Sequence, residues 1–398
     1  ELPRTGVFSD GSLVSVWEHD DTGADDDLTR IFRSTRAPGE DWSAPEAFPV
    51  DDVWGLGSIS TLPDGGIQIA YGWEPHFPDI VHRVRIWGAD GSVTANGLGN
   101  TSDDYVLYGD ADGHTIAERL GGYHEEAGFD HVLRYHDGVS WQRVPALGAD
   151  PRDVFVAGPG ESVWMAGYDQ ERTMLRVRRW APGQSSWTLD WSRDYPPGHQ
   201  RRPLVDGLDL AVGGPGHVVL AFQEREVGDT GATIRAVRHD PDAGWRPVRR
   251  LQRLAVGEHL TTTAPVVSAA GANVEVAWTS SAPQRGGARQ VWLAQLGDGA
   301  SAPRLLATVE SFSGFRSLSL DVDVRDDGDV LVTYLERDGD MRNLVGLLGP
   351  SDQLERTVLL EDTGVALGEA AFLVRGVAAV VGAVRGELLL SRVAEGAI

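Results

Sequence analysis

A repeat of about fifty residues, which runs through the whole chain, constrains the fold more than any other feature. In each copy a glycine turn, usually Asp-Gly or Pro-Gly, leads into an apolar strand that ends near an aromatic or small residue. The turn glycines recur at intervals of 47 to 57 residues, at Gly11, Gly65, Gly113, Gly160, Gly216, Gly271, Gly328 and Gly376. A period of this length indicates an array of similar units rather than a succession of different domains.

Each copy continues with a strand rich in Arg and aliphatic residues, as in 29–33, 132–135 and 234–238, and often with a Trp that a Pro soon follows. Three or four short strands per unit are typical of a β-propeller blade. The sequence therefore predicts an all-β fold, a single β-propeller domain over residues 1–398, with eight blades of about 50 residues, or seven if one weak unit is not a blade. The alternative is two packed β-sandwiches, which do not require this spacing.

The last unit lacks a clear fourth strand after Val393, so we expect ring closure to recruit the first residues of the chain. Radial closure of this kind protects the edges of the sheets. Long helical periodicity is absent from the sequence, which argues against α/β alternatives.

Composition excludes several chemistries. The 398 residues include 59 acidic and 35 basic side chains, a formal net charge of −24, no Cys and no Lys. Thiolate catalysis, disulfides and iron–sulfur clusters need Cys, and Schiff-base catalysis needs Lys. An acidic surface repels the phosphate backbone, so we expect no nucleic-acid partner. No apolar run is long enough for a membrane-spanning helix. Carboxylates, His, Tyr and Arg remain, and we expect no cofactor.

The chain starts at Glu1 rather than Met and shows no signal sequence. A mature secreted protein whose signal has been removed, or a trimmed chain, has this appearance. We therefore expect an extracytoplasmic location, secreted or at the cell surface. We also expect a monomer.

A carboxylate follows an aromatic or strand-ending residue at equivalent positions where several second strands end. In a four-stranded blade these strand ends open on the same face, so the acids form a ring around one mouth of the channel. Crowded carboxylates raise one another's pKa, which is how general acids arise. Another interpretation is that loop ends in an acidic protein are simply charged. The ring would comprise Glu18, Glu74, Glu125, Asp169, Glu224 and Glu336.

Paired carboxylates and neighbouring aromatics suit a glycan. Hydrolysis requires two carboxylates, ~5 Å apart for retention or ~6.5–9.5 Å apart for inversion. The candidate catalytic acids are Glu18, Asp26, Glu74 and Glu125. The long connection at 189–207 adds aromatic and Arg side chains that suit a substrate carboxylate, or that neutralise nearby acids. The candidate substrate-binding residues are Arg4, Trp73, His76, Tyr123, His124, Asp169, Tyr195, Arg201, Arg202 and Glu224.

The densest group of His and acidic residues lies at 124–131, where His124, Glu125, Glu126, Asp130 and His131 occur together. His and carboxylate side chains suit zinc or iron. The spacing matches no helical ligand motif, and alternation in a strand separates neighbours. A solvated loop is the interpretation we favour, and we assign no metal site.

The first unit resembles the opening blade of the sialidase superfamily. Arg4, Gly11, Glu18, Asp25–Asp27 and the segment 34–42 occur in the order of that family's first Arg, turn, acidic residues and Asp-box. The Asp-box is degenerate, because Arg36 stands where the family has Asp. The resemblance implies a propeller, glycoside hydrolysis and a substrate contact by Arg4. The middle units resemble a broader set of bacterial propellers that share no activity, and a shared fold does not carry a function.

We therefore expect an extracytoplasmic carbohydrate-active propeller that hydrolyses or binds a glycan at an acid- and aromatic-lined channel mouth. The first alternative is a non-catalytic propeller that senses a ligand or binds another protein. The second is a lyase or a metal-assisted enzyme that uses His124, His131 and His199.

Overall fold

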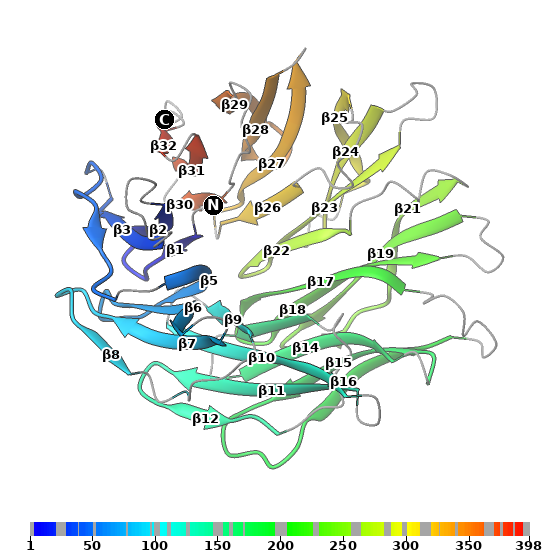
Figure 1. The fold of residues 1–398 in the computed structure, drawn as a ribbon. Helices are drawn as coiled ribbons and strands as arrows, with labels where there is room; N and C mark the ends of the chain where they lie inside the picture. Colours follow the sequence, from blue (N-terminus) through cyan, green and yellow to red (C-terminus); the bar gives the residue numbers. More distant parts are fainter. Residues whose placement is uncertain are drawn as a thin grey trace.

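The chain forms strands and turns arranged around a centre (Figure 1). The computed structural model describes residues 4–20, 29–38, 40–50, 53–76, 79–95, 98, 104–109, 113–124, 128–145, 154–158, 162–169, 172–195, 205–225, 231–255, 264–281, 288–296, 301–310, 320–325, 327–338, 341–361, 370–374, 377–384 and 387–392. None of these residues is helical.

Eight consecutive units, which we call blades 1 to 8, divide the strands. Blade 1 consists of β1 (Arg4–Val7), β2 (Leu13–Asp20), β3 (Thr29–Arg36) and β4 (Glu46–Ala47), and blade 2 of β5 (Val53–Thr61), β6 (Ile67–His76), β7 (Asp79–Trp87) and β8 (Val93–Ala95). Blade 3 consists of β9 (Asp104–Gly109), β10 (His114–His124), β11 (Gly128–Asp137) and β12 (Trp141–Arg143), and blade 4 of β13 (Val154–Gly158), β14 (Ser162–Asp169), β15 (Met174–Trp180) and β16 (Thr188–Asp194).

Blades 5 to 8 continue the same order. Blade 5 consists of β17 (Val205–Gly214), β18 (His217–Arg225), β19 (Gly231–Asp240), β20 (Gly244–Trp245) and β21 (Arg249–Ala255), and blade 6 of β22 (Val266–Ala270), β23 (Asn273–Ser281), β24 (Ala288–Gln295) and β25 (Arg304–Glu310). Blade 7 consists of β26 (Leu320–Val324), β27 (Asp329–Asp338), β28 (Met341–Pro350) and β29 (Glu355–Glu361), and blade 8 of β30 (Ala370–Val374), β31 (Val377–Val384) and β32 (Glu387–Arg392).

Each blade is an antiparallel meander of neighbouring strands. A single backbone pair, Thr29 with Val53, joins blades 1 and 2 into one sheet. The first strands of consecutive blades contact one another from β1 through β5, β9, β13, β17, β22 and β26 to β30, so they form the inner ring of the fold. This arrangement confirms the predicted all-β propeller and its eight units.

The glycine turns have the conformation that the repeat predicts. Gly11 and Gly65 have φ values of 83° and 81°, a region that is costly for residues with a Cβ. In three of these turns the Asp before the glycine accepts a backbone hydrogen bond: Asp10 from Ser12 N at 2.8 Å, Asp64 from Gly66 N at 3.0 Å and Asp327 from Asp329 N at 3.2 Å. The recurring Asp-Gly pairs are thus structural.

Hydrophobic side chains fill the space between adjacent blades, where the two sheets pack face to face. One cluster joins blades 5 and 6 and includes Val219, Ile234, Val276 and Trp278, and Trp278 has no exposed surface. Comparable clusters join blades 1 and 2, 4 and 5, and 6 and 7. Stability therefore resides mainly in the seams between blades.

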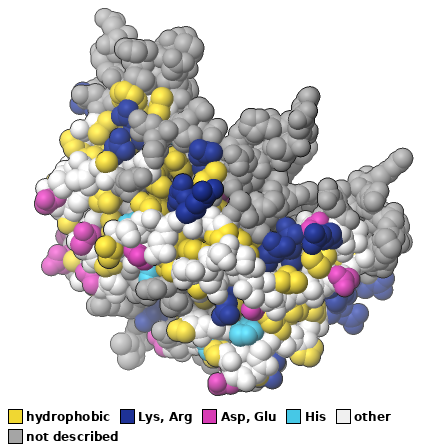
Figure 2. All heavy atoms as spheres, turned by 90° about the horizontal axis from the view of Figure 1, so that it is seen from below, with side chains coloured by type: hydrophobic (Ala, Val, Ile, Leu, Met, Phe, Trp, Pro, Cys, Tyr) yellow, Lys and Arg dark blue, Asp and Glu magenta, His cyan; other side chains and the backbone are white. Residues whose placement is uncertain are grey.

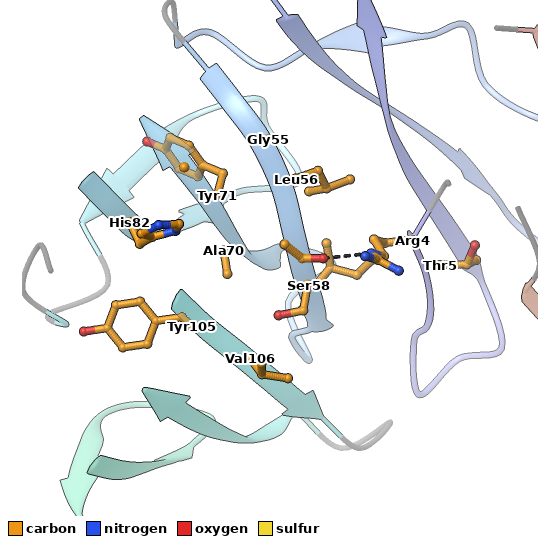
Figure 3. Close-up of a pocket in the computed structure, with 13 residues that line it drawn as sticks. Arg4, Thr5, Gly55, Leu56, Ser58, Ala70, Tyr71, His82, Tyr105 and Val106 are labelled. Carbon is orange, nitrogen blue, oxygen red and sulfur yellow. Dashed lines mark hydrogen bonds between the residues drawn. The ribbon is translucent and has the colours of Figure 1, made fainter. Parts of the chain in front are cut away.

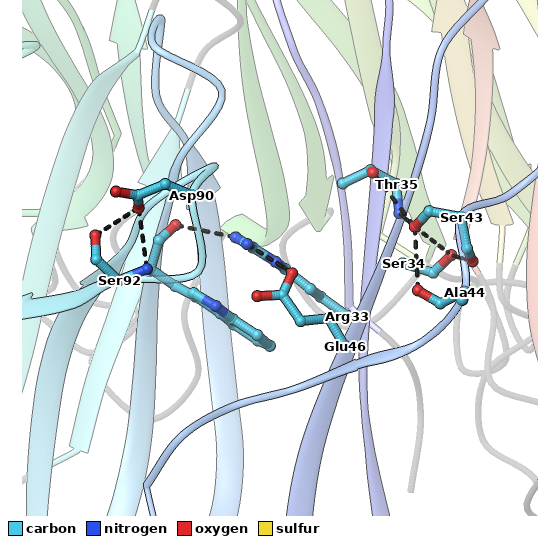
Figure 4. Close-up of polar contacts among 9 residues, drawn as sticks. Arg33, Ser34, Thr35, Ser43, Ala44, Glu46, Asp90 and Ser92 are labelled. Carbon is cyan, nitrogen blue, oxygen red and sulfur yellow. Dashed lines mark hydrogen bonds and ion pairs between the residues drawn. The ribbon is translucent and has the colours of Figure 1, made fainter.

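The Arg-rich third strands contribute polar bonds to these seams. Arg33 of β3 is only 4% exposed and its guanidinium lies 4.3 Å from the Trp87 ring centre in blade 2 (Figure 4). Its Nη1 donates to Trp87 O at 3.2 Å, and its Nη2 lies 2.8 Å from Glu46 Oε2. In the same way Arg238 Nη1 of blade 5 donates to Leu296 O of blade 6 at 2.8 Å. Arg thus joins neighbouring blades at positions where a buried charge needs several partners.

The ends of the chain differ from the closure that the sequence suggests. β1 pairs with β2 inside blade 1, with Arg4 opposite Val16, so residues Arg4–Val7 do not complete blade 8. Blade 8 is described as three strands, β30 to β32.

Charge is dispersed on the face drawn in Figure 2. Arg and carboxylate side chains form small separate groups there, with hydrophobic atoms between them. Within the described ranges, no helix has the length and apolar character needed to cross a membrane.

Candidate functional site

Several predicted site residues lie outside what the structure describes. Asp26, Glu125, Arg201 and Arg202 are not among the described residues. Four others are described only by their backbone, at the ends of β6 and β10: Glu74, His76, Tyr123 and His124. Their roles stay predictions.

Asp169 and its neighbours form a charge network at the end of β14. Asp169 Oδ2 lies 2.6 Å from Arg176 Nη1, and Asp169 Oδ1 accepts the Arg172 backbone N–H at 3.0 Å. Asp169 therefore ties β14 to the turn and strand that follow it. Its proposed contact with a substrate remains a prediction.

Tyr195 and Glu224, predicted from distant parts of the sequence, lie in one cluster between blades 4 and 5. Arg193 donates to Glu224 Oε1 through Nε at 3.1 Å and Nη2 at 2.9 Å, and Arg235 pairs with Glu224 Oε2. The Tyr195 ring centre lies 5.5 Å from the Arg193 guanidinium. Burial raises the pKa of Tyr195, and the charge of Glu224 raises it further, although Arg193 opposes the shift.

Thr173 holds the backbone of Tyr195 in place. Tyr195 N donates to Thr173 O at 2.9 Å, and Thr173 Oγ1 donates to Tyr195 O at 3.1 Å. Thr173 has a φ of 51°, the single positive value among the described non-glycine residues. The paired hydrogen bonds offset the strain of that conformation. Arg193 of blade 4 and Arg235 of blade 5 both pair with the Glu224 carboxylate, so this cluster links the two blades.

A cavity of about 630 Å³ lies among the inner strands of blades 1 to 3. It exists because β5 does not run regularly along β6: the register shifts between Val53 and Gly55 and again between Leu56 and Ile59. A bulge bends a strand and disrupts its ladder. A Cβ added at Gly57 would lie 3.2 Å from the Ala70 carbonyl oxygen, so glycine permits the close approach of β5 and β6.

The cavity has an aromatic end and a cationic end (Figure 3). Tyr71, His82 and Tyr105 gather on one side, Arg4 lies on the other, and Leu56 and Ser58 of β5 stand between them. Arg4 is exposed, and its Nε donates to Gly57 O at 2.7 Å. The lining comprises Arg4, Thr5, Gly55, Leu56, Gly57, Ser58, Ile59, Ala70, Tyr71, Gly72, His82, Tyr105 and Val106.

Two further predicted residues, Glu18 and Trp73, lie next to β5. Glu18 of β2 is 7% exposed, and a Cβ added at Gly55 would lie 3.7 Å from Glu18 Oε1. Its carboxylate is thus buried behind a lining glycine rather than displayed at a channel mouth. Trp73 of β6 packs beside the core of blades 1 and 2, with the Arg83 guanidinium 3.4 Å from its ring centre. Burial raises the pKa of Tyr71, and the charges of Arg85 and Arg83 oppose that shift.

The aromatic and imidazole residues of the lining, Tyr71, His82 and Tyr105, were absent from the sequence-based set. Arg4 alone connects the predicted set to the lining. One signal in the sequence does point here, because Gly55 and Gly57 interrupt an otherwise apolar strand. Glycine inside a strand pattern often marks a bulge or a close approach.

The inner strands of blades 5 to 7 carry acids instead. Asp209 Oδ2 accepts the backbone N–H of Val267 from blade 6 at 2.8 Å, and burial raises the pKa of Asp209 to about 6 despite its backbone hydrogen bonds. Burial also raises the pKa of Asp321 to about 6, and the charges of Asp323 and Asp209 add to the effect. Although the surrounding protein shields the Asp321 carboxylate, its side chain remains exposed to solvent.

Within the described part of the chain, no three His, Asp or Glu side chains are grouped closely enough to hold a metal ion. His124 is described only by its backbone, and His131 and His199 have no described side chain, so the metal-assisted alternative stays untested.

No family model matches the chain, and no curated protein does. Similar solved structures include the β-propeller domain of the trilobed protease from Pyrococcus furiosus, with 10% identity, a TM-score of 0.48, and coverage of 92% of this chain and 97% of that one. An ulvan lyase of polysaccharide lyase family PL25 has 11% identity, a TM-score of 0.49, and coverage of 86% and 94%. The six-bladed fucose-binding lectin of Aleuria aurantia has 13% identity, a TM-score of 0.40, and coverage of 77% and 95%. Such remote similarity does not assign a ligand, and the sialidase resemblance of blade 1 gains no specific support.

Proposed function

We propose that this propeller binds a glycan in the cavity beside β5. The observation that carries the proposal is the lining itself, where two tyrosines, one histidine and one arginine surround about 630 Å³. Ligand sites typically occupy ~300–1,000 Å³ and combine aromatic surface with a few polar groups. The extracytoplasmic location expected from the sequence is part of the proposal.

Sugar rings suit this lining for a physical reason. Their apolar C–H faces pack on aromatic rings, and their hydroxyls need hydrogen-bond partners when they leave water. Tyr105 and His82 are both half-buried, so each keeps a surface for contact. Strand glycines Gly55, Gly57 and Gly72 also bring backbone close to a ligand.

Binding without hydrolysis fits the described side chains better than the hydrolase prediction. Glycoside hydrolysis uses two carboxylates that flank the bond. Among the described residues that line the cavity none is Asp or Glu. Of the candidate catalytic acids only Glu18 has a described side chain, and its Oε1 would lie 3.7 Å from a Cβ added at Gly55. We therefore propose a binding module rather than a hydrolase.

The test is calorimetric titration of the purified protein with a panel of oligosaccharides, for the wild type, Tyr105→Ala and Tyr105→Phe. We expect Tyr105→Ala to weaken binding about tenfold or more, because a central aromatic contact is lost, and Tyr105→Phe to keep most of the affinity. Leu305→Ala is the control, since Leu305 is exposed on the outer strand of blade 6. Equal affinities for Tyr105→Ala and wild type would disprove this site.

A further inference from the structure

We infer that β21, the outer strand of blade 5, is a docking edge for an acidic segment of a partner protein. The segment binds as an added strand and places acidic side chains opposite Arg250 and Arg253. This docking edge is separate from the proposed glycan site, because the β5 cavity lies among blades 1 to 3. Extended peptides that add to a sheet edge gain affinity from main-chain hydrogen bonds and specificity from side chains.

The outer part of blade 5 reverses the charge of the chain. Residues 246–253 contain four arginines and no acidic residue, whereas acidic side chains outnumber basic ones 59 to 35 overall. The outer strands β16, β25 and β29 each include Asp or Glu. Complementary charge steers a partner to one surface and disfavours others. An acidic segment is therefore attracted to β21 more strongly than to the outer strands that carry acids.

The strand β21 forms an edge of its sheet. It pairs with β19 along one side, from Ala236 opposite Arg249 to Gly231 opposite Ala255, and no strand of the described residues pairs with its other side. Figure 1 shows β21 at the outer rim of the fold. An edge strand presents backbone N–H and C=O groups that can pair with another chain. The backbone of β21 thus offers a template for one more strand.

One face of β21 is committed to the seam between blades 5 and 6. Leu251 and Leu254 are buried in the hydrophobic cluster of that seam. Arg249 Nη1 donates to Gln295 O of blade 6 at 3.1 Å, and Arg249 Nη2 donates to Ser301 O. These residues hold two blades together, so the side chains that face a partner must come from the other face.

Arg250 and Arg253 lie on that other face, and both are exposed. Arg250 is opposite Arg235 and Arg253 is opposite Thr233, because a register shift inserts one extra residue into β21 between them. Their partners on β19 are thus two residues apart, although the two arginines are three apart. Residues two apart in a strand share one face. We therefore expect an added strand to meet both arginines with residues two apart, at the distance of a cross-strand pair.

The carboxylates between blades 4 and 5 already have partners. Arg235 pairs with Glu224, and Glu224 also accepts from Arg193 Nη2 of blade 4 at 2.9 Å. A second carboxylate, Asp190 of β16, accepts the indole N–H of Trp245 at 2.8 Å. Because two arginines share the charge of Glu224, this side of blade 5 keeps an excess of positive charge. An acidic segment neutralises that excess.

The experiment compares two short peptides of identical composition, blocked at both ends and made of Thr and Val with two Glu residues. The Glu residues are two positions apart in the first peptide and three positions apart in the second. Fluorescence anisotropy of the labelled peptides measures their affinity for wild type. We expect the first peptide to bind about two- to fivefold more tightly at low salt, because both of its Glu residues reach an Arg, and added salt to reduce the difference.

Hydrogen–deuterium exchange shows how the peptide binds. We expect the first peptide to slow amide exchange in residues 249–255, because an added strand pairs with backbone groups of the free edge. Unchanged exchange rates in this segment with the peptide bound would overturn the added-strand geometry.

Three double variants locate the effect. Arg250→Gln with Arg253→Gln is expected to remove the preference for the first peptide, and Arg250→Lys with Arg253→Lys, which keeps both charges, is expected to retain part of it. Arg143→Gln with Arg172→Gln makes the same change in net charge at exposed positions of blades 3 and 4 and should preserve the preference. Melting temperatures of the variants verify folding.

The remaining outcomes identify other occupants. Equal affinities for the two peptides, or an unchanged preference in the Gln variant of β21, would overturn the inference. A dimer that sedimentation detects for wild type but not for that variant would make a second copy of the chain the occupant. Binding of dextran sulfate with no binding of either peptide would assign β21 to a polyanion instead. The oligosaccharide titrations are separate measurements, so the glycan site can fail while the docking edge stands, and the reverse.

Discussion

The inner strands on opposite sides of the ring come from the same repeat, but they differ in how regularly they pair with their neighbours. In blades 6 and 7, β22 and β26 pair with their neighbours in unbroken register. Val267 N of β22 there bonds to Asp209 of blade 5, and Val324 N of β26 bonds to Ser268 Oγ of blade 6 at 3.2 Å. In blade 2, β5 shifts register twice and leaves a cavity. A register shift does not by itself open a cavity, because β17 also shifts register twice and its Asp209 still closes the seam to blade 6.

The largest expected loss of stability follows a substitution in a seam between blades, and it is compared with a substitution in the cavity wall. Trp278→Ala removes a fully buried side chain from the seam of blades 5 and 6, and we expect a loss of about 3–5 kcal/mol in the free energy of unfolding. Tyr105→Ala at the half-buried cavity wall is expected to cost less than about 2 kcal/mol. Urea denaturation of both variants measures the difference. Similar losses would show that the cavity wall is also a core element.

An effect of intermediate size is expected on the pH dependence of stability, through Asp321 on the inner strand of blade 7. The folded-state pKa of Asp321 is raised to about 6, above its ordinary value of 3.8, so the folded protein holds this proton more tightly. Its contribution to stability is therefore present below pH 4 and is lost as the pH rises through about 6. We expect Asp321→Asn to be more stable than wild type at pH 8 and equal to it near pH 4.

Thermal unfolding of both proteins from pH 4 to pH 8 measures this change. Asn keeps an oxygen that can accept the Val322 N–H bond, so the comparison isolates the charge. Asp242→Asn, in an exposed turn, is the matched control and should follow the wild-type curve. If the curves of Asp321→Asn and wild type stay parallel, Asp321 does not titrate in this range.

The smallest expected change in stability comes from Gly55→Ala, which tests the cavity while leaving the fold intact. A Cβ at Gly55 meets its nearest atom, Glu18 Oε1, at an ordinary 3.7 Å, so Gly55→Ala should alter stability by less than about 0.5–1 kcal/mol. The new methyl group narrows the cavity, and we expect glycan affinity to fall severalfold in calorimetry. Unchanged affinity would show that the ligand does not reach this part of β5.

Much of the fold was predictable because it repeats. The turn glycines at 11, 65, 113, 216, 271 and 328 all have positive φ, and each needs only its own neighbours to form the turn. The Arg-rich strands were also expected as strands. Their role in bonding one blade to the next was not predicted, because Arg33 and Trp87 are a full repeat apart and meet only after the sheets pack.

The candidate site was predictable only in part, since burial and register are not local properties. Glu18 was expected at an open mouth, but the structure buries it behind Gly55. Tyr195 and Glu224 were proposed separately, and Arg193 brings them together. His82 and Tyr105 carry no sequence motif, and they line a shared cavity only because blades 2 and 3 pack together.

The sequence by itself determined an all-β chain of eight similar units, because turn glycines and alternating apolar strands act over a few residues. It also determined that Arg is the fixed cation available to any ligand. The tertiary structure decided which charges are buried, paired or displayed. Those properties depend on how one blade packs against the next, and strand spacing alone does not specify that contact.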